Sequence, residues 1–109
     1  MQDLYTELQQ IRAELNKSIK MLRNSGNKSA EAERAYQITK TQTAFRLEAE
    51  GKSASFINMV IKGMPEVAEK AYERDVALVM YETNKEHINV CKKDLSVVEA
   101  QIEREWHSG

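Results

Sequence analysis

The sequence predicts an all-α protein, folded as an antiparallel helical hairpin or bundle around one long C-terminal coiled-coil helix. Its 109 residues include four Gly and one Pro, too few turn-forming residues for a set of short strands. Apolar residues recur at helical spacing along most of the chain. No Gly or Pro interrupts residues 66–106, which leaves room for a continuous helix of about 60 Å.

We expect one helical domain, residues 1–109, because this length leaves no room for a second core. The first predicted helix, residues 3–24, carries a heptad stripe of Leu4, Leu8, Ile11, Leu15 and Leu22. It is expected to end at Asn24-Ser25-Gly26-Asn27, since Gly and Asn favour a helix C-cap. The second predicted helix, residues 29–50, has a thin stripe rich in Ala, so it depends on packing.

The remaining two helices are predicted from their end signals. Gly51-Lys52 breaks the pattern, and Ser53 or Ser55 caps a short helix over 54–62. Pro65 suits the first turn of the long helix, residues 65–106. The short turns favour antiparallel neighbours.

The long helix carries a coiled-coil seam that we expect to be an oligomer interface, most simply of a dimer. Two N-terminal helices of about 33 Å, packed side by side, leave the C-terminal half of this seam uncovered. If they stack end to end instead, the seam is covered and a monomer is expected. Asn84 in the seam is interpreted either as a residue that controls register or as one that is simply exposed near a helix crossing. The interface residues are Tyr81, Asn84, Ile88, Cys91, Leu95, Val98 and Ile102.

A second stripe on the same helix repeats at strict seven-residue intervals, so one partner helix cannot cover both stripes. It consists of Val76, Thr83, Val90 and Val97.

The segment from Phe56 to Met64 holds six large apolar residues in nine positions. One interpretation is a plug that closes the end of the bundle. The other is a docking surface for another protein, where Met side chains adapt to a partner. The candidate docking residues are Phe56, Ile57, Val60, Ile61 and Met64.

Charge is unevenly placed along the chain. Residues 1–64 hold ten Lys and Arg against seven acids, net +3, and residues 65–109 hold six against ten, net −4. One interpretation of the basic residues is pairing with the acidic long helix; the other is contact with phosphates of single-stranded DNA. The candidate nucleic-acid contacts are Arg12, Lys17, Lys20, Arg23 and Lys28.

The sequence assigns no catalytic residue, metal site or cofactor. His87, Cys91 and Asp94 have a spacing that suits a metal, yet Cys91 occupies the apolar seam and a zinc site needs a fourth ligand. No Ser has a His and an acid at recognisable spacing. We therefore expect a protein that is not an enzyme.

The compartment expected from the sequence is the cytoplasm, that of the host if a phage encodes the chain. Cys91 is the single cysteine, no segment has the roughly 20 apolar residues of a membrane span, and the first residues are polar and acidic. We expect no membrane partner.

Several short segments resemble a group of small helical proteins from phages and prophages of Gram-positive bacteria. They are Glu73-Arg74-Asp75-Val76-Ala77, Glu86-His87-Ile88-Asn89-Val90 and the closing Ile102-Glu103-Arg104-Glu105-Trp106. The resemblance covers roughly residues 30–109 and implies an early gene region for recombination, single-strand binding or replication. It supplies no site residues.

The leading functional hypothesis is a non-enzymatic accessory protein of phage DNA replication or recombination. It would act through contacts with a phage or host protein and through weak contact with single-stranded DNA. The alternatives are an anti-defence protein that binds a host immune effector or its nucleotide signal, and a structural or assembly adaptor.

Overall fold

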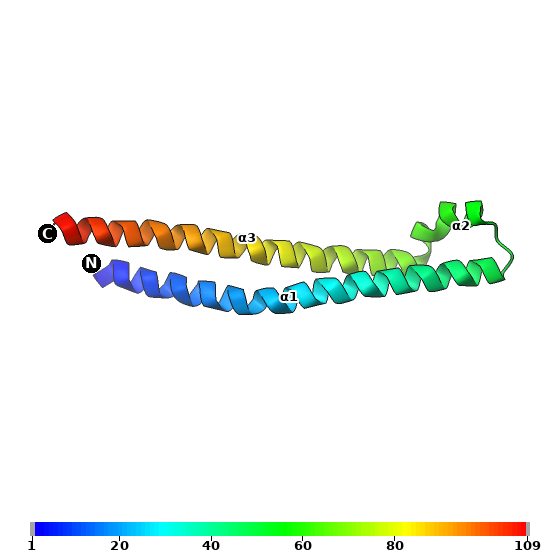
Figure 1. The fold of residues 1–109 in the computed structure, drawn as a ribbon, viewed down its shortest axis with the longest axis horizontal. Helices are drawn as coiled ribbons and strands as arrows, with labels where there is room; N and C mark the ends of the chain where they lie inside the picture. The colour runs from blue at the N-terminus through cyan, green and yellow to red at the C-terminus, as the bar shows by residue number, and fades with distance from the viewer. Residues whose placement is uncertain (1, 109) are drawn as a thin grey trace. The chain divides into compact units, whose positions relative to one another are not determined.

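The computed structural model describes residues 2–108, and these are almost entirely helical, without a strand. The elements are α1 (Gln2–Ala49), α2 (Ala54–Val60), the 3-10 helix η1 (Ile61–Gly63) and α3 (Pro65–Ser108). Figure 1 shows α1 and α3 as the two long helices, with α2 in their connection. The prediction of an all-α fold with a long C-terminal helix is confirmed.

Helix α1 is continuous through the predicted turn at residues 24–27, so the prediction of two N-terminal helices is wrong. The heptad spacing runs on through this segment: Leu22 is followed at steps of three, four and three by Ser25, Ser29 and Ala32, all half-buried. Gly26 does not take the left-handed conformation that would end a helix. Packing of the seam outweighs the local end signal, since a Gly inside a helix costs only about 1 kcal/mol.

The end of α1 and the start of α2 follow the sequence signals. Gly51 has a φ of 84°, and its N–H donates to the carbonyl of Glu48 at 2.9 Å. The N–H of Lys52 donates to the carbonyl of Leu47 at 3.1 Å, which completes a Schellman motif. Ser53 then caps α2, because its hydroxyl accepts from the N–H of Phe56 at 3.1 Å.

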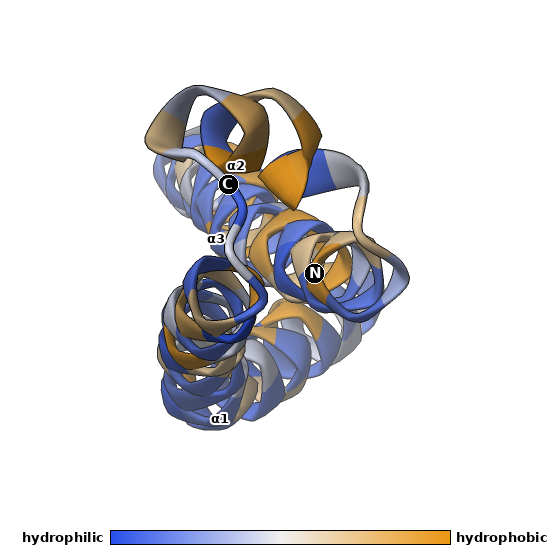
Figure 2. Ribbon diagram, turned by 90° about the vertical axis from the view of Figure 1, so that its right-hand side faces the viewer, coloured by the Kyte–Doolittle hydropathy of each residue, from blue (hydrophilic) through white to orange (hydrophobic). Residues whose placement is uncertain are grey.

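The described chain divides into two compact units, and α1 and α3 pass through both. The first unit contains residues 2–24 and 81–108, and the second contains residues 25–80. In each unit the α1 segment and the α3 segment run antiparallel (Figure 1). Figure 2 shows hydrophobic turns recurring along both helices among hydrophilic ones.

The second unit has a contiguous core made by α1, η1 and α3. Its buried members are Tyr36, Leu47, Ile61 and Val67. Val67 has no exposed surface, and it lies in the first turns of α3, where Pro65 fixes the start of the helix. In the first unit the buried apolar residues are Leu8, Ile88, Cys91 and Val98.

Candidate functional site

The seam of α3 is covered within the chain, which corrects its assignment as an oligomer interface. Ile88, Cys91 and Val98 are buried. The other predicted interface residues, Tyr81, Asn84, Leu95 and Ile102, are half-buried. The cover comes from the N-terminal segment of α1, which lies in the same unit as this part of α3.

Asn84 makes a polar contact within this seam, between α3 and α1. Its Nδ2 donates to the backbone carbonyl of Ser18 at 3.2 Å, and Ser18 itself is buried. A hydrogen bond between a side chain of one helix and the backbone of the other is satisfied at one longitudinal position only. It therefore favours this alignment of the two helices over shifted ones.

His87 and Cys91 lie together beside Glu14 in the first unit. His87 Nε2 is 3.0 Å from Glu14 Oε1 and 3.7 Å from Cys91 Sγ. Burial raises the pKa of the Cys91 thiol, and the negative charges of Glu14 and Asp94 raise it further. A thiol held in its protonated form is a poor nucleophile and a poor metal ligand. Among residues 2–108 no three His, Cys, Asp or Glu side chains form a potential metal site.

The apical segment, residues 56–64, fits the plug interpretation more closely than the docking one. Ile61 is buried, and Ile57, Val60 and Met64 pack against the core of the second unit, so four of the five predicted docking residues are engaged. Phe56 keeps 37% of its surface exposed, with Lys52 Nζ 5.4 Å from its ring centre. Met59 belongs to the same apolar segment but was not among the candidate docking residues, and it is 75% exposed.

The basic residues of α1 are the best-supported candidate site. Arg12 lies 4.0 Å from Glu99 of α3, in an exposed pair of little energetic weight. The other four predicted contacts are exposed and form no ion pair with a described residue: Lys17, Lys20, Arg23 and Lys28. The interpretation in which these residues pair with the acidic long helix therefore holds for Arg12 alone.

Two acids of α1 near these cations are directed toward α3. Glu14 pairs with His87 in the first unit, and Glu33 lies 3.7 Å from Arg74 in the second. Arg74 also stacks over the ring of Tyr36 at 4.1 Å. Glu14 is the one acid between residues 12 and 28, so the charged side chains of this stretch that form no ion pair with a described residue are cations. We call Arg12, Lys17, Lys20 and Arg23, all in the first unit, the basic face.

One further cation of α1 was missed by sequence reasoning. Arg34, in the second unit, follows Arg12 and Arg23 at intervals of eleven residues, which is close to three helical turns. The expected helix break separated it from the others. The eleven-residue spacing itself was a signal in the sequence that could have identified it.

A second charged cluster joins α1 to the start of α3 in the second unit. Arg46 Nη2 lies 2.6 Å from Glu66 Oε1, and the hydroxyl of Thr43 donates to the same oxygen at 3.4 Å. A hydrogen bond from its own backbone N–H lowers the pKa of Glu66 most, followed by the hydrogen bond from Arg46. This exposed cluster connects the start of α3 to α1.

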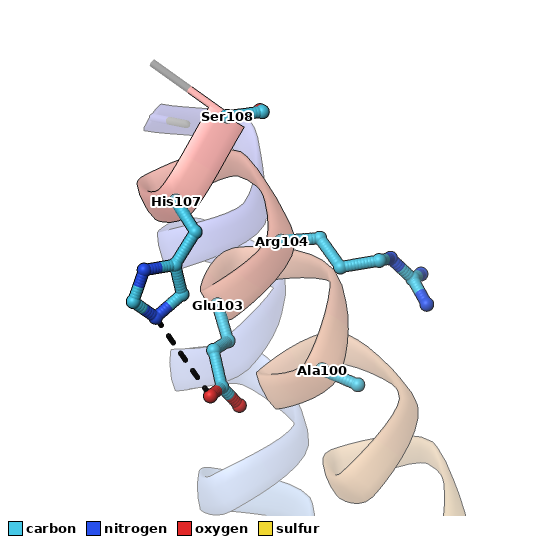
Figure 3. A pocket seen from close by; sticks show the side chains of 5 residues that line it. All are labelled: Ala100, Glu103, Arg104, His107 and Ser108. Carbon is cyan, nitrogen blue, oxygen red and sulfur yellow. Dashed lines mark ion pairs between the residues drawn. The ribbon is translucent and has the colours of Figure 1, made fainter.

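Two hollows in the surface of the first unit lie at the last turns of α3. One, of about 450 Å³, is lined by Ala100, Glu103, Arg104, His107 and Ser108. His107 Nε2 is 3.9 Å from Glu103 Oε1, and Figure 3 shows the Arg104 side chain directed away from this pair. The lining side chains are exposed and do not converge on one point, so the hollow has no arrangement typical of catalysis.

Comparison of the chain with family models, curated proteins and solved structures gave no match. Within residues 2–108, none of the helices is both long and apolar enough to cross a membrane.

Proposed function

We propose that this chain is a non-enzymatic helical accessory protein of phage DNA replication or recombination, which holds single-stranded DNA weakly on the basic face of α1. The observation that supports the proposal most is that Lys17, Lys20 and Arg23 have no carboxylate partner among the described residues. Cations already paired within a protein gain little from a phosphate, whereas free ones displace the counterions of the nucleic acid.

The dimensions of the basic face suit a flexible strand better than a specific duplex site. From Arg12 to Arg23 the helix rises about 16 Å, enough for a few consecutive phosphates. No aromatic residue lies between Arg12 and Arg23, so stacking on bases adds nothing and little sequence preference is expected. The assignment to phage DNA metabolism rests on the sequence resemblance, and the mode of binding rests on the basic face.

Protein contact is the second part of the proposal. Phe56 and Met59 of α2 are the exposed apolar residues of the apical segment, and we assign to them the contact with a phage or host replication protein. An exposed aromatic ring beside a flexible thioether is typical of adaptable binding surfaces.

The test is binding of fluorescent single-stranded oligothymidine, followed by anisotropy at several salt concentrations. Binding is expected at low salt, and the logarithm of the association constant should fall with that of salt with a slope of about −3 for four phosphate contacts. The double variant K20E/R23E should lose binding. Its matched control is K62E/K92E, which makes the same charge change at two exposed lysines outside the basic face and should bind as the parent does.

Circular dichroism of both double variants checks that the helices are intact. The proposal is wrong if the parent does not bind at low salt. It is equally wrong if K20E/R23E and K62E/K92E bind alike, because the attraction then follows net charge and has no defined face.

A further inference from the structure

The second apolar stripe of α3 is exposed. In the first unit it consists of Thr83, Val90 and Val97, and the two valines keep 44% and 56% of their surface accessible. Val90 follows the buried Ile88 by two residues and precedes the buried Cys91 by one, so it points away from the α1 segment that covers them. The stripe is a different face from the seam.

The residues that accompany this stripe complete a coiled-coil pattern. Glu86, Lys93 and Ala100 follow Thr83, Val90 and Val97 by three residues each, and all six are exposed. Alternating steps of three and four keep them on one side of the helix, as in the core positions of a heptad repeat. Such a pattern is complementary to another helix more than to a flat or irregular surface.

The charges on the stripe select the orientation of that second helix. Neither Glu86 nor Lys93 forms an ion pair with a described residue. If two copies of α3 run antiparallel about an axis near Val90, Glu86 faces Lys93 of the second copy, and the reverse pair forms by symmetry. A parallel arrangement sets Glu86 against Glu86 and Lys93 against Lys93, which repel.

We propose that a second copy of this chain docks on this stripe, with the two α3 helices antiparallel and the two-fold axis near Val90. Val90 then packs against its own counterpart, and Thr83 lies opposite Val97 of the second copy. A symmetric interface of this kind is self-complementary, because each copy supplies both halves of every pair. The surface lies on α3 and does not involve the basic face of α1, so this inference stands apart from the proposed function.

The dimer is expected to be reversible. The stripe from Thr83 to Ala100 is about 25 Å long, and its apolar side chains are small, so the buried area falls at the low end for specific interfaces. We expect dissociation in the micromolar range.

Sedimentation equilibrium over about 5–500 µM tests the proposal on the full chain. The parent should pass from monomer to dimer. E86K places Lys opposite Lys93 of the second copy, and K93E places Glu opposite Glu86; each creates two like-charge contacts and should raise the dissociation constant about tenfold. The double variant E86K/K93E exchanges the partners and should restore the parent value.

Matched controls place the same charge changes elsewhere on α3. K92E alters the residue next to Lys93, on a different side of the helix, and E69K alters an exposed acid of the second unit. Both should dimerise as the parent does. V90D should abolish the dimer, whereas M59D, a similar change at an exposed residue of α2, should not.

A parent that stays monomeric over the whole range overturns the proposal. So does a dimer that V90D leaves intact, since its interface then lies elsewhere. A dimer weakened by V90D but not restored in E86K/K93E overturns the antiparallel arrangement. The single charge variants discriminate further, because a parallel dimer would keep its like-charge contacts and respond weakly to either change.

Discussion

At the scale of single residues, we expect substitution of Val67 to destabilise the fold. Val67 has no exposed surface and packs among Tyr36, Leu47 and Ile61. Val67→Ala removes two methyl groups from this contact and should lower the free energy of unfolding by about 1–3 kcal/mol. Urea denaturation gives the value. Val79→Ala, at a side chain with 63% of its surface exposed, should change it by less than about 0.5 kcal/mol.

Glu66 should contribute to the pH dependence of stability. Its pKa in the folded chain is lowered by its own backbone N–H and by Arg46. A depressed folded pKa stabilises the protein above the unfolded pKa, and this contribution disappears as the pH falls through the folded pKa. Glu66→Gln should therefore be less stable than the parent near neutral pH, and the two urea midpoints should converge in acid.

Glu69→Gln provides the control for this titration. Glu69 is an exposed acid one turn further along α3 and makes no ion pair with a described residue. Its urea midpoint should follow that of the parent across the pH range. A constant gap between Glu66→Gln and the parent down to about pH 2 would show that the loss is not electrostatic.

At the scale of the elements, the continuity of α1 through residues 24–27 can be tested by substitution. Gly26→Pro should remove a backbone hydrogen bond in the middle of the helix and introduce a clash, at a cost of about 3 kcal/mol or more. A turn at this place would accept Pro with little loss. Asn24→Ala is the companion variant: in a continuous helix this exposed position should be neutral or slightly stabilised, as thermal unfolding would show.

Most element boundaries could be predicted because each rests on a local chemical cause. Gly51 adopts a positive φ, Ser53 accepts a backbone hydrogen bond, and Pro65 begins a helix, as expected from their side chains. Residues 24–27 carry a similar local signal, yet the neighbouring helix holds them helical through Leu22, Ser25 and Ser29. A single sequence shows the local signal more clearly than the competing packing.

The incorrect prediction of a break in α1 also led to the incorrect prediction that the seam of α3 is an oligomer interface. Two separate helices would have been too short to cover the seam of α3, whereas the continuous helix covers Ile88, Cys91 and Val98. The apical residues Ile61 and Met64 were placed correctly in an apolar cluster, but periodicity alone does not tell a plug from a docking surface. The basic face could be predicted from the sequence, but the pairing of Arg12 with Glu99 and the lack of an ion pair between Lys17, Lys20 or Arg23 and a described residue required side-chain positions.

At the scale of the whole molecule, the two units differ in how their interiors are built. The second unit has a contiguous apolar cluster besides its buried Thr43, whereas the first has buried Ser18 and the Asn84 contact among its apolar residues. Hydrogen exchange followed by mass spectrometry should therefore show the slowest amides around Leu47, Ile61 and Val67. Amides near residues 3–10 and 99–108 should exchange fastest. The opposite order would place the stabilising core in the first unit.

The place of Leu4 beside the last turns of α3 has a consequence for chain connectivity. Leu4 lines the same surface hollow as Gln101, Arg104 and Ser108, so the beginning of α1 and the end of α3 are neighbours. A short Gly/Ser linker can join them, and exposed Gly51-Lys52 offers a place to open new termini. In such a circular permutant α3 precedes α1, and each helix keeps the neighbours it has now. We therefore expect the two helices to pack in the same way whichever of them the ribosome synthesises first.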